Sequence, residues 1–299
     1  MNGLIWIIVG MVIILLVAYI VTSIRFSRNI ALPNVSSLEK EMQWEKEHHL
    51  WGDFDSYEKT GYTVKGYQDY QLNVVLVKAA APSDKYVIIS HGYTANRYGA
   101  VKYLDAYRNQ GYHVIIYDVR GHGDNKKVPV SLGYFEAKDL IAIIEDTYAR
   151  YGQDIYLGLH GESMGSSISL NALAYKPKVK FVVADCGFTN LYELIEGLYR
   201  QHKAWLLIFG VNWMMRLIQG FNMKATSAID ALKENEVPVM FIHGKNDTFI
   251  FPEHSEKLAA ANHGKSVLHL VERATHAGSR QTLGMPAYAA LIRDFLEGI

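Results

Sequence analysis

The most reactive pattern in the 299-residue sequence is Gly-Glu-Ser-Met-Gly at residues 161–165, with Ser163 at its centre. The preceding residues 155–160 form an apolar run typical of a strand, and residues 166–175 have the pattern of a helix. In a strand-to-helix turn, glycines on both sides of a serine avoid Cβ clashes and keep the hydroxyl exposed. The pattern therefore predicts Ser163 as a nucleophile, with a plain glycine-rich turn as the alternative.

A serine hydroxyl is a weak nucleophile and needs a histidine as base, which in turn needs a carboxylate to orient it. When the serine lies on such a turn, the expected chain order is serine, acid, histidine. Asp247 and His276 each follow an apolar run that is expected to form a strand. The sequence therefore predicts a triad of Ser163, Asp247 and His276. Asp185, at the end of the first strand after the turn, is an alternative acid, and His243 is a candidate for a position behind the site.

Two backbone N–H groups are expected to stabilise the negative charge that develops on a substrate carbonyl oxygen. One is the N–H of Met164, directly after the nucleophile. The other is the N–H of Tyr93, in the loop His-Gly-Tyr-Thr at residues 91–94 that follows an apolar run. The sequence therefore predicts an oxyanion hole formed by the backbone of Tyr93 and Met164.

The rest of the chain supplies the strands and helices that would bring these residues together. Short Val- and Ile-rich runs alternate with helical patterns, which favours a mostly parallel sheet covered by helices on both faces. The carboxyl ends of parallel strands meet at one edge of the sheet, where the site is expected. An antiparallel pair at 61–67 and 71–78 is predicted to open the domain. Later strands are predicted at 86–90, 113–119, 155–160, 181–185, 237–243 and 266–271, and helices at 97–110, 135–151, 166–175, 253–261 and 286–297.

The first residues predict a membrane anchor. Residues 3–22 carry no charge and are rich in Ile, Leu and Val. A helix of this length spans about 30 Å, the thickness of a bilayer core. We therefore predict a single transmembrane helix at residues 1–24 rather than a cleaved signal peptide. Arg25 and Arg28 follow it and favour a cytoplasmic catalytic domain. Residues 25–57 are predicted as a polar stalk and 58–299 as the catalytic domain.

Composition and missing motifs exclude several other classes of function. The 30 Lys and Arg residues balance the 30 Asp and Glu residues, so no net charge would attract a nucleic acid. Cys186 is the only cysteine, so neither an internal disulfide nor a paired-cysteine zinc site can form. The sequence contains no H-E-x-x-H and no P-loop pattern. We expect no metal and no cofactor, and as partners a membrane and a small-molecule or lipid-like acyl substrate.

Five motifs occur together in one order: His91-Gly92, Tyr-Asp-Val-Arg-Gly-His-Gly at 117–123, the pattern at 161–165, His243-Gly244 with Asp247, and His276. In order and spacing they resemble the α/β-hydrolase fold family over about residues 60–299. Within it, the chain is similar to bacterial membrane-anchored esterase-like, lipase-like and serine aminopeptidase-like hydrolases, and to depalmitoylating thioesterases with an N-terminal anchor. The resemblance implies that residues 120–123 shape a loop beside the site. Gly-Asp-Asn at 123–125 departs from the common Gly-x-Ser.

The resemblance also implies a helical cap over the site. In the family, a cap is inserted between the strand after the nucleophile and the strand that carries the acid, and an apolar helical segment lies there at about residues 190–225. Phe209, Trp213, Met214 and Met215 are predicted to line an acyl-chain pocket, because Met and aromatic side chains adapt to flexible chains. Ordinary packing of the cap against the domain is the alternative.

The combined prediction is a serine hydrolase that cleaves carboxylic esters or thioesters of apolar acyl groups through an acyl-enzyme intermediate. A serine peptidase is one alternative, although only Glu193 and Glu196 in the cap offer acidic groups for a peptide amino terminus. A non-catalytic binding module on the same fold is another. Such modules usually lose a triad member, and none is missing here.

Overall fold

The computed structural model describes residues 2–299 and contains an eight-stranded sheet. The strand order is β1-β2-β4-β3-β5-β6-β7-β8. β2 is antiparallel to both of its neighbours, and every pair from β4 to β8 is parallel. This is the predicted fold class, and each predicted strand is present. The strands are β1 (Lys59–Lys65), β2 (Gln71–Val77), β3 (Lys85–Ser90), β4 (His113–Tyr117), β5 (Tyr156–Glu162), β6 (Val182–Asp185), β7 (Val239–Gly244) and β8 (Ser266–Val271).

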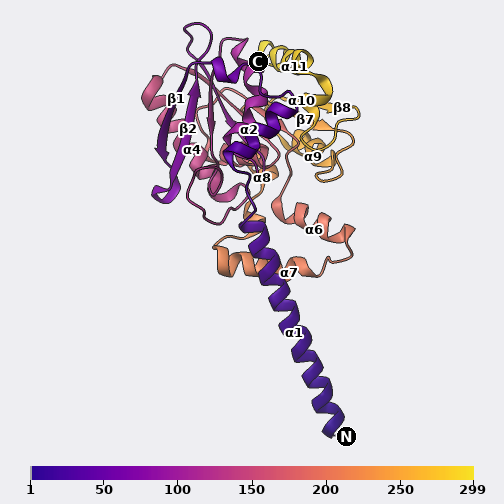
Figure 1. Cartoon of the computed structure of the whole chain (residues 1–299). Coiled ribbons are helices and arrows are strands. Elements are labelled where there is room, and N and C mark those ends of the chain that lie inside the picture. The colour runs from indigo at the N-terminus through magenta and orange to yellow at the C-terminus, as the bar shows by residue number, and fades with distance from the viewer. Residues whose placement is uncertain (1) are drawn as a thin grey trace.

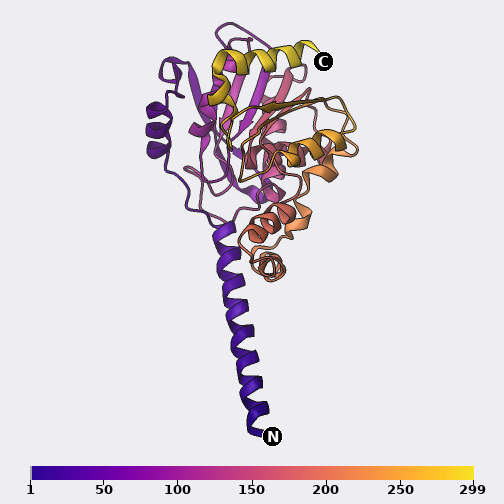
Figure 2. The ribbon, with the colours of Figure 1, turned by 90° about the vertical axis from the view of Figure 1, so that its right-hand side faces the viewer.

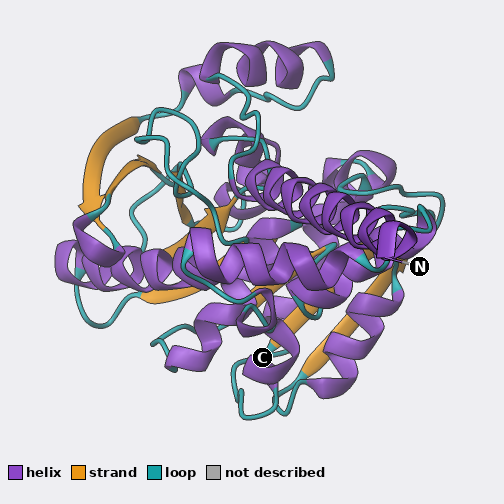
Figure 3. Cartoon of the chain, turned by 90° about the horizontal axis from the view of Figure 1, so that it is seen from below, coloured by secondary structure: helices purple, strands orange, loops and turns teal. Residues whose placement is uncertain are grey.

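Helices cover both faces of the sheet (Figure 3). Alternate residues of the central strands enter two separate cores: Ile88 and Ile115 face one, and Ile89 and Ile116 face the other. Strands buried on both sides need apolar residues at successive positions, which explains the continuous apolar runs in the sequence. The α-helices are α1 (Asn2–Ala31), α2 (Leu38–Glu47), α3 (Leu104–Arg108), α4 (Tyr134–Tyr151), α5 (Met164–Ala172), α6 (Leu191–Gln201), α7 (Leu207–Met214), α8 (Ala228–Leu232), α9 (Glu253–Ala261), α10 (Ser279–Leu283) and α11 (Met285–Glu297).

Helix α1 projects from the domain as one long rod (Figures 1 and 2). Among the described residues, 2–299, it is the one helix long and apolar enough to cross a membrane. The large apolar side chains between Leu4 and Val17 are exposed. The last turn joins the domain, where Ala31 is buried and its carbonyl accepts a hydrogen bond from the N–H of Val130 at 2.8 Å. The helix is therefore longer than predicted, and its end is part of the folded domain.

The segment between α1 and the sheet packs on the domain, which differs from the polar stalk predicted at 25–57. Helix α2 lies against a 3₁₀ helix at Arg97–Tyr103. Trp51 and Phe54 are buried, and the Trp51 ring meets the Tyr98 ring edge-on, with centroids 5.2 Å apart. The segment carries many charged residues, but the apolar side chains between them attach it to the domain.

Helices α6 and α7 form the inserted cap, at the end of the domain from which α1 projects (Figure 1). Helix α7 crosses α1: the Tyr19 hydroxyl donates to the carbonyl of Leu206 at 2.8 Å and accepts from the N–H of Gly210 at 2.9 Å. Gly210 permits this close approach, because a Cβ there would lie 2.2 Å from the Ser23 hydroxyl oxygen. A π-helical turn at Met215–Gln219 continues α7. The cap therefore contacts α1 as well as the domain.

Candidate active site

Ser163 lies in the turn between β5 and α5, with φ 54° and ψ −115°. A positive φ of this kind is strained for a residue with a side chain. The flanking glycines make the turn possible. A Cβ on Gly161 would lie 2.1 Å from the carbonyl oxygen of Gly165, and a Cβ on Gly165 would lie 2.0 Å from that of Ser90. The strand-to-helix turn predicted from the sequence is therefore present, and its geometry accounts for both glycines.

The three predicted triad residues come together at the carboxyl ends of β5, β7 and β8. The hydroxyl oxygen of Ser163 is 2.9 Å from Nε2 of His276. Nδ1 of the same ring is 2.7 Å from Oδ2 of Asp247. With Nδ1 donating to the carboxylate, Nε2 carries no proton and can accept one from the serine. This is the arrangement that general-base activation of a serine requires.

Asp247 is buried, and its hydrogen bonds favour the ionised form. Oδ1 accepts from the N–H groups of Phe249 and Ile250, both at 2.9 Å. Oδ2 accepts from His276 and lies 3.2 Å from Nε2 of His243. Burial by itself would raise the pKa of Asp247, but the hydrogen bonds from His243, His276 and Ile250 outweigh it and hold this pKa well below its ordinary value. His243, predicted only to lie behind the site, is a direct partner of the acid.

Asp185, the alternative acid, has other partners. It is fully buried and accepts hydrogen bonds from the hydroxyl of Tyr288 at 3.0 Å and from that of Ser279 at 3.2 Å. Burial raises the pKa of Asp185 to about 6. Because His276 is bonded to Asp247, the structure gives Asp185 no part in orienting the histidine.

The two predicted oxyanion donors flank Ser163. Met164 is the first residue of α5, so its N–H is one of the donors that a helix leaves free at its N-terminus. Across the turn, a Cβ on Gly92 would lie 3.7 Å from the Cβ of Ser163. The loop that carries the N–H of Tyr93 therefore passes close beside the nucleophile, and Tyr93 and Met164 line the same cavity as Ser163.

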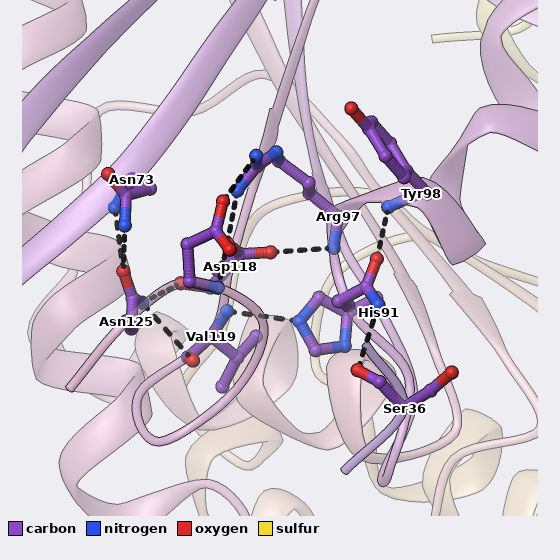
Figure 4. Close-up of polar contacts among 10 residues, drawn as sticks. Ser36, Asn73, His91, Arg97, Tyr98, Asp118, Val119 and Asn125 are labelled. Atoms are coloured by element: carbon purple, nitrogen blue, oxygen red, sulfur yellow. Dashed lines mark hydrogen bonds and ion pairs between the residues drawn. The ribbon is translucent and has the colours of Figure 1, made fainter. Parts of the chain in front are cut away.

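A buried histidine, His91, bonds to the backbone of Val119 (Figure 4) and fixes the loop that carries Tyr93. Nε2 of His91 accepts a hydrogen bond from the N–H of Val119 at 3.0 Å, so Nδ1 carries the proton and donates to the carbonyl of Gly92 at 2.8 Å. Burial lowers the pKa of His91 far below its ordinary value and keeps the ring neutral. Because a trans peptide holds its carbonyl and N–H on opposite edges, this bond also sets the direction of the Tyr93 N–H.

Asp118 supports the neighbouring loop (Figure 4). Its carboxylate accepts hydrogen bonds from the backbone N–H of Arg97 at 2.9 Å and of Asp124 at 3.0 Å, and forms an ion pair with the Arg97 guanidinium. The Asn125 side chain donates to the carbonyl of Asp118 at 2.7 Å. The Gly-Asp-Asn sequence at 123–125, which departs from the family pattern, therefore supplies donors that hold this loop.

An apolar cavity of about 290 Å³ lies beside Ser163. Its walls come from the end of α1, from the loops around the triad and from α6. None of the lining residues carries a charged side chain. In residues 2–299, no group of three or more His, Cys, Asp or Glu side chains is arranged to hold a metal ion. The lining residues are Phe26, Asn29, Ile30, Tyr93, Leu132, Ser163, Met164, Phe188, Leu194, Ile195, Leu198, Tyr199, Phe249 and Ile250.

The four cap residues predicted to line an acyl pocket do not line this cavity. Phe209 and Trp213 are 57% and 59% exposed, on the side of α7 that faces away from the core. Met214 and Met215 are buried in the packing beneath the helix. A helix turns successive residues to different sides, so an apolar helix cannot present all of them to one pocket. The cap wall of the cavity comes from α6 instead.

The contribution of α1 to the cavity has no counterpart in the sequence patterns. The Phe26 ring meets the Tyr199 ring of α6 edge-on, with centroids 5.7 Å apart. The hydroxyl of Tyr93 donates to the carbonyl of Ile30 at 2.8 Å. The end of the long N-terminal helix is thus a wall of the cavity, although these residues are far from the triad in sequence.

Comparison with known sequences agrees with this architecture. The sequence model of the family described as "alpha/beta hydrolase fold" matches residues 85–210. The chain is 28% identical over 297 residues to the uncharacterized protein YqkD of Bacillus subtilis (strain 168), covering 95% of each chain. It is also 24% identical over 195 residues to protein ABHD12B of Homo sapiens, covering 58% of this chain and 48% of that protein.

Solved structures agree as well. The esterase PF2001 of Pyrococcus furiosus superposes with a TM-score of 0.66 at 22% identity, covering 83% of this chain and 94% of the esterase. The acylaminoacyl peptidase of Pyrococcus horikoshii superposes with a TM-score of 0.61 at 16% identity, covering 81% of this chain and 41% of the peptidase. The chain therefore has the α/β-hydrolase fold.

Proposed function

We propose that the protein is a serine hydrolase that cleaves carboxylic esters or thioesters of apolar acyl groups. The observation that carries this proposal is the continuous hydrogen-bonded series from Ser163 through His276 to Asp247, beside an apolar cavity. The series supplies a nucleophile and its base, and the cavity supplies a place for an acyl chain.

The reaction proceeds in two halves. The Ser163 oxygen attacks the acyl carbon while Nε2 of His276 takes the hydroxyl proton. The bond from the acyl carbon to the leaving oxygen or sulfur then breaks, and His276 returns the proton to the leaving group. In the second half, His276 removes a proton from water, the hydroxide attacks the acyl-serine, and the carboxylic acid leaves as the proton returns to Ser163. Asp247 stabilises the charged imidazole in both halves.

Each half passes through a tetrahedral intermediate with a negatively charged oxygen. The N–H groups of Met164 and Tyr93 are proposed as its donors. Mutation of one such donor in other serine hydrolases costs about 3 kcal/mol of transition-state stabilisation. The bond from His91 to the Gly92 carbonyl supports the proposal, because it fixes the Tyr93 peptide before substrate arrives.

The lining of the cavity favours an apolar acyl group over a peptide with a free amino terminus. A protonated amine needs an acidic partner, and no acidic residue lines the cavity. The two acidic candidates in the cap have other partners: Glu193 accepts from the Thr189 hydroxyl at 2.8 Å, and Glu196 pairs with Arg200 at 2.8 Å. Burial of an acyl chain contributes about 0.8 kcal/mol per methylene. We therefore favour the ester and thioester activity over the peptidase alternative.

Helix α1 is proposed to anchor the enzyme in a membrane, with the catalytic domain on the cytoplasmic side. Its length and exposed apolar surface support the anchor. Arg25 and Arg28, directly after the apolar stretch, support the orientation. A cysteine introduced at Ser56, which is exposed, tests the side: in intact cells it should resist impermeant thiol reagents, and ready labelling would place the domain outside.

Covalent labelling tests the catalytic proposal. A fluorophosphonate should label the wild-type protein and should not label Ser163→Ala, because the phosphonate reacts with an activated serine. Ser56→Ala, which removes an exposed serine outside the cavity, should label like the wild type. Turnover of the wild-type protein is then compared on a panel of acetyl and long-chain esters and thioesters. Labelling that persists in Ser163→Ala, or a wild-type protein that neither labels nor hydrolyses any acyl substrate, would refute the proposal.

A further inference from the structure

A stripe of exposed apolar side chains runs along the outer side of α7 and continues into the residues just before and just after this helix. A helix packed on one side normally carries polar residues on the other. Here the inner side is buried, with Ile208, Val211 and Met215 in the core. The outer side is apolar too, and we call it the α7 stripe: Trp205, Leu206, Phe209, Trp213, Leu217 and Ile218, which are 42%, 57%, 57%, 59%, 66% and 47% exposed.

The α7 stripe lies beside the helix proposed to cross the membrane. Tyr19 of α1 bonds to the backbone of Leu206 and Gly210, and Gly210 lies against Ser23. Figures 1 and 2 show α7 lying across α1 at the base of the domain, with the free part of α1 continuing beyond it. Whether a membrane that surrounds α1 also reaches α7 therefore depends on how far along α1 the membrane extends.

The length of α1 places the crossing point at the membrane. The part of α1 before the crossing, residues 3–18, is about 24 Å long at about 1.5 Å per residue. A bilayer hydrocarbon core is about 30 Å thick. The uncharged stretch continues to Ile24, past the crossing at Tyr19. A hydrocarbon core that covers the whole uncharged stretch must therefore extend to the level of α7.

The charges around the α7 stripe also suit a lipid surface. Residues 202–229 contain Lys203, Arg216 and Lys224 and no acidic residue, and Arg200, just before them, pairs with Glu196. The guanidinium of Arg200 lies over the Trp205 ring, 5.7 Å from its centroid. Basic groups beside Trp and Leu side chains are typical of helices that lie in the membrane interface, where the cations meet anionic headgroups.

We propose that α7 and the turn after it lie in the interface of the membrane that α1 crosses, with the α7 stripe in contact with lipid. The occupant of this surface is the bilayer itself. The enzyme then has two membrane contacts, a spanning helix and an interfacial helix, and they are held together by the Tyr19 hydrogen bonds. Phe209 and Trp213 contact lipid in this arrangement.

The same arrangement brings the cavity close to the leaflet, a consequence that rests on the proposed function. Phe26, which lines the cavity, is seven residues beyond Tyr19 on α1, so it lies about 10 Å above the crossing. Ile30, four residues further along α1, also lines the cavity, and α6 forms another part of its wall. An apolar acyl chain that leaves the lipid beside α7 therefore has a short path to Ser163.

Depth-dependent fluorescence quenching tests the lipid contact directly. The full-length protein is reconstituted in vesicles of phosphatidylcholine and phosphatidylglycerol, and an environment-sensitive thiol dye is attached to Trp213→Cys. The native Cys186 is fully buried, so the introduced thiol is the accessible one. Lipids with a nitroxide on the upper acyl chain should quench this dye. Ile299→Cys, an exposed apolar position at the opposite end of the domain (Figure 1), should not be quenched.

A dye on Ile7→Cys in α1 reports whether the anchor has inserted. Quenching at 7 and 213 supports the proposal. Quenching at 7 without quenching at 213 overturns it, and cross-linking between two copies through 213 would then assign the α7 stripe to a dimer. No quenching at either position overturns the proposal as well, because α7 would lack the membrane that α1 brings.

A second measurement tests delivery of the substrate. Trp213→Glu should lower the hydrolysis of a long-chain ester carried in vesicles by roughly tenfold or more, since a charge is costly in the apolar interface. Its rate on a soluble acetyl ester should match the wild type, and Ile299→Glu should change neither rate. Equal rates on vesicle substrate in wild type and Trp213→Glu would overturn the delivery step. An enzyme inactive on every ester would refute the proposed function but leave the quenching result intact.

Discussion

Replacing Asp247 with asparagine tests the triad through one change in hydrogen bonding. In the wild type, Oδ1 accepts from the backbone N–H groups of Phe249 and Ile250, both at 2.9 Å. An amide NH₂ cannot accept from these donors, so the asparagine carbonyl must take that position. The NH₂ then faces His276 and donates to Nδ1, which moves the ring proton to Nε2. In that tautomer the histidine cannot accept the proton of Ser163.

The structure sets the size of the effect. The opposite orientation of the amide would restore the correct tautomer but would leave two buried N–H groups without acceptors, at about 1–3 kcal/mol each. The productive orientation is therefore disfavoured by about 2–6 kcal/mol. At about 1.4 kcal/mol per factor of ten, kcat should fall by about 30-fold to about 2 × 10⁴-fold. The nucleophile, the cavity and the oxyanion donors remain, so KM for a short ester should change little.

The assay compares steady-state turnover of a chromogenic acetyl ester and the rate of fluorophosphonate labelling in Asp247→Asn and Asp185→Asn. Thermal unfolding of each variant checks that the fold is retained. Asp185→Asn should retain most of its turnover, since Asp185 bonds to Tyr288 and not to His276. A folded Asp247→Asn with wild-type turnover, together with an inactive but folded Asp185→Asn, would refute the assignment of the acid.

Two further predictions concern the cavity and helix α2. Leu198→Trp, which fills part of the cavity, should lower kcat/KM for long-chain esters while sparing acetyl esters. The control Leu217→Trp, at an exposed position, should leave kcat/KM for soluble esters of every chain length unchanged. Equal losses of kcat/KM on all chain lengths in Leu198→Trp would contradict the acyl pocket. Glu45 is 1% exposed, and burial raises its pKa from 4.5 to about 8. Between these two pH values the folded state keeps a proton that the unfolded state loses. The free energy of unfolding should therefore fall as pH rises from about 4.5 to about 8. Thermal unfolding of Glu45→Gln should depend less on pH in this range, and an identical pH dependence in both proteins would argue against a protonated Glu45.

The sequence was sufficient for the fold and for the geometry around the nucleophile, because both depend on short-range rules. Strands buried on two faces require continuous apolar runs, and the runs identified all eight strands. A sharp strand-to-helix turn requires glycine where a Cβ would meet backbone, as at Gly161 and Gly165. The order of serine, acid and histidine follows from the same architecture, so Ser163, Asp247 and His276 could be named before any distance was known.

The sequence favoured Asp247 as the acid and left Asp185 as the alternative, and the distances that exclude Asp185 are contained in no local pattern. Asp185 and Asp247 both follow strands, and only the three-dimensional arrangement brings Asp247 to His276. The role of His243 was equally hidden, since its bond to Asp247 depends on how the chain folds back after β7. The direction of the Tyr93 N–H depends on a hydrogen bond inside the loop, between His91 and the Gly92 carbonyl.

Tertiary structure alone decided which apolar surface lines the cavity and which remains open. An apolar helix sequence shows that its residues avoid water, but it does not say whether protein or lipid replaces the water. The sides of α7 have different surroundings: Val211 lies in the core, and Trp213 is exposed. The cavity wall is formed instead by α6 and the end of α1. Helix packing between distant segments, and not composition, determines which side chains meet.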